Sequence, residues 1–307
     1  MNNRLAPIIL FLAASLSPAL AADRNPPPEV VASIKPVHSV VAAVIAGAGV
    51  PELLMPGGAS PHAYALKPSD ARKLANARAV FWIGPELENV LQTPIRNLST
   101  RARVVALGTA TGVRRLPARH GGVWETDDPD HDHETGAIDG HLWLDPRNGA
   151  AMATAIAENL AAIDPSRAAL YHQNAGKFRA RMTTLDAELS GKLRGLETRH
   201  YLVFHDAYQY FETRYGLSPM GAVAVAPDRP VGPRRVAELR SRLEGNGVVC
   251  AFSTPEFSPR LFNALTEGTR VKTAALDDLG ANIPAGPLLY ETLLTRMADA
   301  ASACLRP

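Results

Sequence analysis

The chain has 307 residues, of which 46% are hydrophobic, and it carries 32 basic and 30 acidic residues for a formal net charge of +2. This charge balance, together with the absence of a long Lys or Arg run, argues against nucleic acid or an anionic membrane surface as a partner. The length and apolar content fit a globular protein of about two domains.

Residues 1–21 have the pattern of a cleavable secretory signal peptide. Arg4 precedes the apolar segment Leu5–Leu16, and Ala19-Leu20-Ala21 supplies small residues at the cleavage site. No cysteine lies near the cut. We therefore expect an exported protein without a lipid anchor at its new N-terminus.

After the signal peptide, short apolar runs alternate with helical patterns. The expected strands are Val30–Ile34, Leu53–Met55, Ala79–Ile83 and Arg103–Leu107, followed by Tyr201–Phe204, Leu217–Val225, Val248–Phe252 and Val271–Leu276. Such alternation predicts βα units around mostly parallel sheets. We expect an α/β protein with an N-terminal lobe over residues 22–163 and a C-terminal lobe over residues 198–307.

An acidic loop is expected over residues 120–140 of the first lobe. Seven acidic residues and no Lys or Arg lie between Glu125 and Asp139, with His131 and His133 among them and His120 just before. A solvated surface insertion and a secondary loop that captures metal weakly both explain this composition, because His- and Asp-rich tracts bind metals loosely.

Between the lobes, the sequence predicts one long helix over residues 164–197. Asp164 is a suitable cap, and Pro165 suits the first helical position. Apolar residues then recur on one helical face, namely Leu170, Phe178, Met182, Leu185, Leu189, Leu193 and Leu196. A helix of about 30 residues would be ~45 Å long, so we expect it to bridge the lobes and limit their hinge motion.

Three histidines lie in loops where α/β proteins bind ligands. His62 ends a Gly/Pro-rich loop, His205 follows the expected strand at 201–204, and His141 precedes a helix that starts near Arg147. Asp277 follows the strand at 271–276, although its surroundings are also typical of a turn. Three neutral imidazoles and one carboxylate suit tetrahedral Zn²⁺, whereas Mn²⁺ prefers more oxygen ligands.

The chain has two cysteines, Cys250 and Cys304. Export places them in an oxidising compartment, so we predict a disulfide between the strand at 248–252 and the C-terminal helix. Two free buried thiols are the alternative.

Several motifs together resemble the receptors of high-affinity zinc ABC transporters, the ZnuA type. They are Ser33-Ile34-Lys35-Pro36, Gly57–His62 with Leu66–Asp70, His141–Pro146, Phe204–Tyr208, and Leu276-Asp277 with Leu279-Gly280. The resemblance implies two α/β lobes joined by a backbone helix, with Zn²⁺ held between them by His62, His141, His205 and Asp277. It also implies a Gram-negative periplasmic receptor, not an enzyme, that serves an inner-membrane ABC permease with a cytoplasmic ATPase. We expect this receptor to be a monomer.

Other metals and functions stay open at this point. Pro61 stands where some similar zinc receptors have a glutamate, so Asp277 or water must complete the metal's shell. Similar manganese receptors usually have a glutamate near Thr254, and its absence here favours zinc. A manganese or iron receptor and a metal-dependent adhesin are alternatives. A secreted zinc hydrolase is another, with Glu256 as the nearest general base.

Overall fold

The structure is a computed structural model that describes residues 26–119, 137–224, 232–245, 247–255 and 257–307. The expected signal peptide, the three histidines of the acidic loop (His120, His131 and His133) and Glu256 lie outside these ranges. Within them, no helix combines the length and apolar character needed to cross a bilayer.

The N-terminal lobe contains a four-stranded parallel sheet in the order β2-β1-β3-β4. Its strands are β1 (Val30–Ala32), β2 (Glu52–Leu53), β3 (Ala79–Trp82) and β4 (Arg103–Ala106). Three helices connect them, α1 (Lys35–Ile45), α2 (Pro68–Asn76) and α3 (Pro85–Leu98). Each has a proline in its first two positions. A missing N–H is harmless there, because no helical carbonyl would accept it.

The C-terminal lobe repeats this arrangement with a parallel sheet in the order β6-β5-β7-β8. Its strands are β5 (His200–His205), β6 (Ser218–Ala224), β7 (Val248–Ser253) and β8 (Lys272–Ala275). The helices are α6 (Gln209–Tyr215), α7 (Pro233–Gly245) and α8 (Pro259–Thr266). All eight expected strands are therefore present within a few residues of their predicted bounds, and the predicted α/β class is confirmed.

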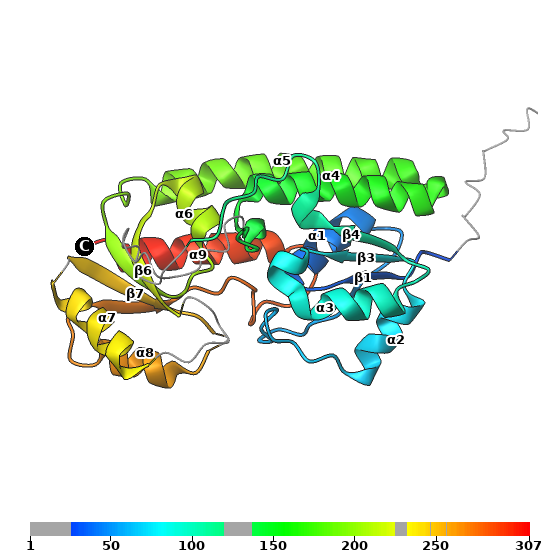
Figure 1. Cartoon of the computed structure of the whole chain (residues 1–307). Coiled ribbons are helices and arrows are strands. Elements are labelled where there is room, and N and C mark those ends of the chain that lie inside the picture. Colours follow the sequence, from blue (N-terminus) through cyan, green and yellow to red (C-terminus); the bar gives the residue numbers. More distant parts are fainter. Residues whose placement is uncertain (1–25, 120–136, 225–231, 246, 256) are drawn as a thin grey trace, which may run out of the picture.

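Two long helices lie side by side (Figure 1): α4 (Pro146–Ile163) packs over the N-terminal lobe, and α5 (Ala168–Leu193) continues from there to the C-terminal lobe. The single helix expected over 164–197 is shorter than predicted. Asp164 is the expected cap, and its side chain accepts hydrogen bonds from Ser166, Arg167 and Tyr171, but the first residues after it, Pro165–Arg167, form a 3₁₀ turn that separates α4 from α5. Gly195, with a φ of 81°, follows the other end. The 26 residues of α5 correspond to about 39 Å.

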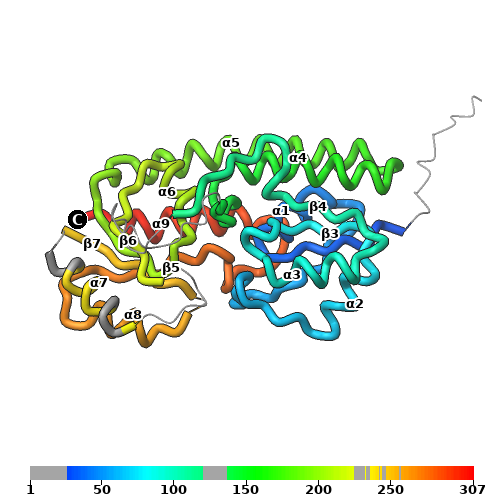
Figure 2. Tube along the Cα trace, viewed as in Figure 1, coloured from blue at the N-terminus to red at the C-terminus, as the bar shows by residue number. Residues whose placement is uncertain are grey.

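A third helix, α9 (Leu289–Leu305), also joins the lobes. It begins where the backbone N–H of Tyr290 donates to Ser39 Oγ of α1 at 2.9 Å. In its last turn, Cys304 forms the predicted disulfide with Cys250 of β7 across a Cα–Cα distance of 5.9 Å. Figure 2 follows the orange-to-red chain from β8 towards the N-terminal lobe and back along α9 to the C-terminus.

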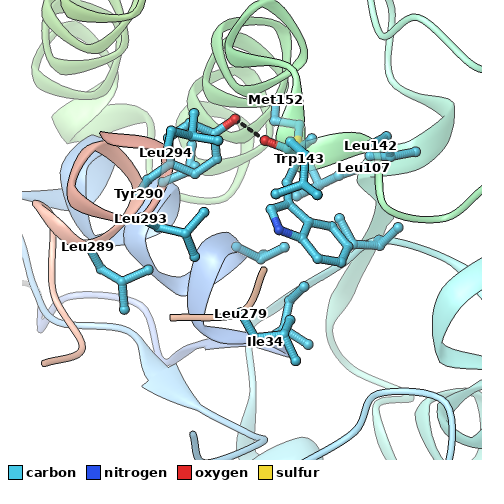
Figure 3. Close-up of a cluster of buried hydrophobic side chains, with 14 of the residues drawn as sticks. Ile34, Leu107, Leu142, Trp143, Met152, Leu279, Leu289, Tyr290, Leu293 and Leu294 are labelled. Carbon is cyan, nitrogen blue, oxygen red and sulfur yellow. Dashed lines mark hydrogen bonds between the residues drawn. The ribbon is translucent and has the colours of Figure 1, made fainter. Parts of the chain in front are cut away.

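The hydrophobic core is continuous between the lobes. Figure 3 shows side chains of α9 packed together with residues of the N-terminal lobe and of the loop after β8: Leu289, Tyr290, Leu293, Leu294, Ile34, Trp143 and Leu279. The Tyr290 hydroxyl donates to the carbonyl of Trp143 within this cluster. Because these contacts cross from one lobe to the other, they hold the two sheets in a fixed relative position on this side.

Lys35 at the start of α1 adds a polar connection between the lobes. The residue is 7% exposed, and its ammonium donates to the carbonyls of Gly280 (2.5 Å), Ala281 (3.1 Å) and Ile283 (2.5 Å). An ammonium has three donors, so all of them are satisfied. A Cβ on Gly57 would lie 2.7 Å from the Ala281 carbonyl. Glycine therefore lets the loop that carries His62 approach this connection.

Candidate metal centre

The structure brings His62, His141 and His205 together, although they come from three separate loops and strands. His62 lies in the loop between β2 and α2, His141 directly precedes the 3₁₀ turn Leu142–Leu144 at the start of α4, and His205 ends β5. The ring centroids are 5.1 to 5.4 Å apart. One nitrogen from each ring lies within 4.8 Å of the other two. Among the described residues, this is the one group of three or more potential ligands that meets that distance.

His141 is positioned by the two residues before it. A Cβ on Gly140 would lie 2.7 Å from Leu87 Cβ, so glycine lets the chain pass close to α3. Asp139 Oδ1 accepts both the backbone N–H of His141 (2.9 Å) and its ring Nδ1–H (2.7 Å). A proton on Nδ1 leaves the Nε2 lone pair available, which is how second-shell carboxylates orient metal-binding histidines.

The Nε2 atoms of His141 and His205 face each other at 3.3 Å. Two nitrogens bound to one tetrahedral zinc ion at about 2.05 Å would be separated by about 3.3 Å. The Nε2 atom of His62 is buried and has no hydrogen-bond partner among the described residues. Because buried nitrogens are normally paired, the imidazole set fits a divalent metal that prefers nitrogen ligands.

The three imidazoles have different proton affinities. Burial, reinforced by repulsion from His141, lowers the pKa of His62 to about 3. Burial likewise lowers the pKa of His205 well below its usual value. Burial alone would also lower the pKa of His141, but the carboxylates of Asp139, Asp278 and Asp206 outweigh it and raise that pKa. His62 and His205 are therefore neutral at physiological pH, the form that binds metal.

Asp277 is not among the clustered ligand atoms. Its Oδ1 accepts the backbone N–H groups of Gly280 (2.7 Å) and Ala281 (3.0 Å), so the side chain caps the turn after β8. The next residue, Asp278, is 2% exposed, and its backbone carbonyl accepts the indole N–H of Trp143 at 2.7 Å. The turn typical of this sequence is present, and of these two neighbouring aspartates it is Asp278 whose charge raises the pKa of His141.

Arg119 connects the two lobes beside the histidines. Its guanidinium forms ion pairs with Asp206, next to His205, and with Glu212 of α6 at 2.7 Å. Glu212 is 3% exposed, and burial raises its pKa to about 7 despite the opposing charge of Arg119. Arg119 therefore offsets part of the cost of burying two carboxylates in this region.

The histidines line a cavity of about 360 Å³. Its wall also includes Glu86, Asn89, Arg119, Asp139 and Asp206. Larger cavities of about 710 and 700 Å³ lie elsewhere and contain none of the three histidines. The carboxylates and imidazoles that line it provide a polar approach for a cation.

Sequence reasoning singled out the three histidines but missed the residues that orient them. Asp139 was counted only as part of the acidic loop, although its place two residues before His141 was a usable signal. The partners of Arg119 and Lys35 could not be found from spacing, because they lie 87 or more residues away in sequence. The proposed secondary loop histidines lie outside the described residues.

Residues 30–304 match the family model described as "Zinc-uptake complex component A periplasmic" (ZnuA). The high-affinity zinc uptake system protein ZnuA of Brucella abortus is 38% identical over 327 aligned positions, which cover 96% of each chain. The protein of the same name from Yersinia pestis is 32% identical and covers 90% of this chain and 91% of its own length.

Solved structures agree on the fold. A zinc-bound ZnuA deletion mutant has a TM-score of 0.77 at 23% identity and covers 92% of this chain and 99% of its own. The periplasmic zinc-binding protein TroA of Treponema pallidum also has a TM-score of 0.77 at 23% identity, with 92% and 100% coverage. FpvC of Pseudomonas aeruginosa, solved with Mn²⁺, has a TM-score of 0.76 at 20% identity and covers 91% and 98%. The fold therefore accommodates different metals, and the ligands must decide among them.

Proposed function

The chain belongs to the family of periplasmic zinc-uptake components, and we propose that it is the receptor that captures Zn²⁺ between its lobes and delivers it to an inner-membrane ABC permease. The cytoplasmic ATPase of such a transporter would drive the import step. We also propose that the receptor acts as a periplasmic monomer after removal of residues 1–21. Family membership supports these assignments.

The observation that carries the proposal is the cluster of three imidazoles in one cavity. We assign His62, His141 and His205 as ligands of the zinc ion, with the Nε2 atoms of His141 and His205 at a separation that suits tetrahedral coordination. Water is the better supported fourth ligand, because Asp277 caps a turn and the cavity of about 360 Å³ has room for solvent. A water molecule occupies about 30 Å³.

Zinc is favoured over manganese by the ligands and by Thr254. Three nitrogen ligands suit Zn²⁺, whereas Mn²⁺ prefers carboxylate and water oxygens. The Thr254 hydroxyl is 3.1 Å from that of Tyr208, which itself donates to the Leu276 carbonyl at 2.8 Å. Thr254 is therefore neutral and hydrogen-bonded, and the resemblance drawn from the sequence expects a glutamate near it in manganese receptors.

The carboxylates of the cavity favour a transport function over hydrolysis, because they are already paired with other side chains. A zinc hydrolase needs a carboxylate free to activate a metal-bound water. Among the described residues, the three carboxylates that line the cavity are engaged: Asp139 with His141, Asp206 with Arg119 and Glu86 with Arg115 at 2.7 Å. We therefore expect a receptor without hydrolytic activity.

Competitive equilibrium dialysis tests the metal assignment directly. The mature protein is dialysed against Zn²⁺ and Mn²⁺ together, and bound metal is counted by elemental analysis. We expect one tightly held zinc that excess manganese does not displace. Preferential retention of manganese would overturn the assignment, and zinc-stimulated ATP hydrolysis by the reconstituted permease would test delivery.

A further inference from the structure

Two short segments flank the acidic loop and pair with each other, and together we call them the stem: Leu116–Arg119 and Ala137–Asp139. Pro117 and Ile138 form an antiparallel bridge. On either side of it, the N–H of Ala118 donates to Ala137 O (2.9 Å) and the N–H of Asp139 donates to Leu116 O (3.0 Å). The stem ends two residues before His141, and its two segments pair with each other outside the N-terminal sheet.

Tyr210 of α6 holds both strands of the stem from the opposite lobe. Its ring is 1% exposed. Its hydroxyl oxygen accepts the N–H of Leu116 at 2.8 Å, and its O–H donates to the carbonyl of Asp139 at 3.0 Å. Tyr210 of the C-terminal lobe thus hydrogen-bonds to both stem segments. One of its partners is the backbone carbonyl of Asp139, and the carboxylate of the same residue accepts the hydrogen bonds from His141.

Arg119 provides a second anchor between the stem and the C-terminal lobe. It is 17% exposed and pairs with Asp206, the neighbour of His205, and with Glu212, two residues after Tyr210. Both anchors end on the segment from β5 to α6. The stem consequently carries His141 with the lobe that supplies His205, even though His141 belongs in sequence to the first lobe.

We propose that Tyr210 is a positioning residue for zinc capture: by clamping the stem at Leu116 and Asp139, with Arg119 as the second anchor, it fixes His141 opposite His205. The His141–His205 pair is then assembled before metal arrives. His62 differs, because it is half-buried and its Nε2 has no hydrogen-bond partner among the described residues. This inference rests on the proposed function, since it concerns the same site.

A substitution at Tyr210 must be separated from a general loss of stability. Tyr210→Phe removes one oxygen and keeps the buried ring. Tyr171→Phe is the matched control, because Tyr171 is also fully buried and donates to Asp164 Oδ2 at 2.6 Å, near the start of α5 and away from the histidines. Both variants lose a buried tyrosine hydroxyl, but only one of these hydroxyls is connected to His141.

The experiment measures zinc affinity by chelator competition and zinc dissociation by stopped flow. Tyr210→Phe should weaken zinc binding by roughly two- to ten-fold, from the loss of a buried hydrogen-bonding group, mainly through faster dissociation. Tyr171→Phe should leave both values unchanged. Asp139→Ala should weaken binding by about 10- to 100-fold, and Tyr210→Phe should add little in that background, because its effect passes through Asp139.

A spectroscopic measurement distinguishes a positioning role of Tyr210 from a role in packing alone. Nitrogen-15 spectra recorded above the pKa of His141, where the ring is neutral, should show it protonated at Nδ1 in the metal-free wild type and as a mixture of tautomers in Tyr210→Phe. If Tyr210→Phe does not fold, Arg119→Lys tests the second anchor and should weaken zinc binding in the same direction.

Wild-type zinc affinity and an unchanged His141 tautomer in a folded Tyr210→Phe protein would overturn the inference. That result would leave the proposed function intact, whereas failure of the wild-type protein to bind zinc through its histidines would remove the function itself.

Discussion

The Nε2 atoms of His141 and His205 lie 3.3 Å apart, although the two residues are separated by 64 positions in the chain. No local motif could produce this contact, because His141 lies just before α4 and His205 ends β5 of the other lobe. The separation matches that of two nitrogens on one tetrahedral zinc ion, about 3.3 Å. Two of the three proposed ligands therefore already have the spacing that zinc requires, and His62 and a fourth group would complete the site.

Removing His205 should abolish tight zinc binding while the fold stays intact. We expect His205→Ala to weaken binding by more than about 100-fold, because even outer-shell partners of a metal ligand contribute about 10- to 100-fold. His172→Ala is the control, since His172 is exposed on α5. Calorimetric titration with zinc and circular dichroism of the same samples measure binding and folding. Nanomolar zinc binding by His205→Ala would exclude His205 as a ligand.

Zinc binding should release about one proton below the pKa of His141, rather than three. The pKa of His62 is near 3 and that of His205 is well below its usual value, because both are buried beside other imidazoles, so both are already neutral. The pKa of His141 is raised by Asp139, so this ring must lose a proton before it binds. Lowering the pH through that pKa should therefore weaken binding by about tenfold per pH unit.

Calorimetry in buffers of different ionisation enthalpy counts the released protons. Release of about three protons would mean that the other two imidazoles are also charged in the free protein. Affinity that stayed flat between about pH 5 and 7.5 would argue against histidine ligation, given the ordinary histidine pKa of about 6.5.

Lys35→Met should destabilise the metal-free protein by about 3 kcal/mol or more, because carbonyls of Gly280, Ala281 and Ile283 lose their donor in a buried setting. Lys73→Met is the matched control. Lys73 is more exposed; it donates to one carbonyl, that of Leu53 at 2.8 Å, and forms a surface ion pair with Glu52 at 3.4 Å, and such a pair is worth about 1 kcal/mol at most. Urea unfolding followed by fluorescence compares the two. Equal unfolding free energies would show that the Lys35 contacts do not hold the lobes together.

The Cys250–Cys304 disulfide should stabilise the fold without contributing to metal binding. It ties α9 to β7 across a sequence separation of 54 residues, and such closures are typically worth ~2–4 kcal/mol. The double variant Cys250→Ser/Cys304→Ser should unfold at correspondingly lower urea concentration and bind zinc with wild-type affinity. A large loss of zinc affinity in the folded double variant would mean that α9 also shapes the metal centre.

The strands were predictable because each is a short apolar run bounded by turn residues. Val248–Phe252 and Tyr201–Phe204 lie within one residue of the strands observed as β7 and β5. The helix at 164–197 was predicted a few residues too long at each end. Asp164 is the cap that the sequence indicated, but Pro165–Arg167 form a 3₁₀ turn before α5 and Gly195 follows its other end, details that the apolar period does not reveal.

The histidines were found through their places after strands and before a helix, but their partners were not. Asp139 lies close enough in sequence to have been recognised, whereas Tyr210 holds the stem from the other lobe. Asp277 was favoured for its position after β8, yet its carboxylate bonds to local N–H groups instead. Side-chain direction within a turn depends on competing backbone donors, and strand-and-loop patterns do not contain that information.

Anomalous X-ray scattering at the zinc edge, from crystals of the zinc-loaded mature protein, tests the central claim most directly. We predict one peak between the lobes, about 2.0–2.1 Å from a nitrogen of each of His62, His141 and His205. The Nε2 atoms should serve as ligands for His141 and His205. A peak that lies away from these three rings, or a site that holds zinc without any one of them, would contradict the account.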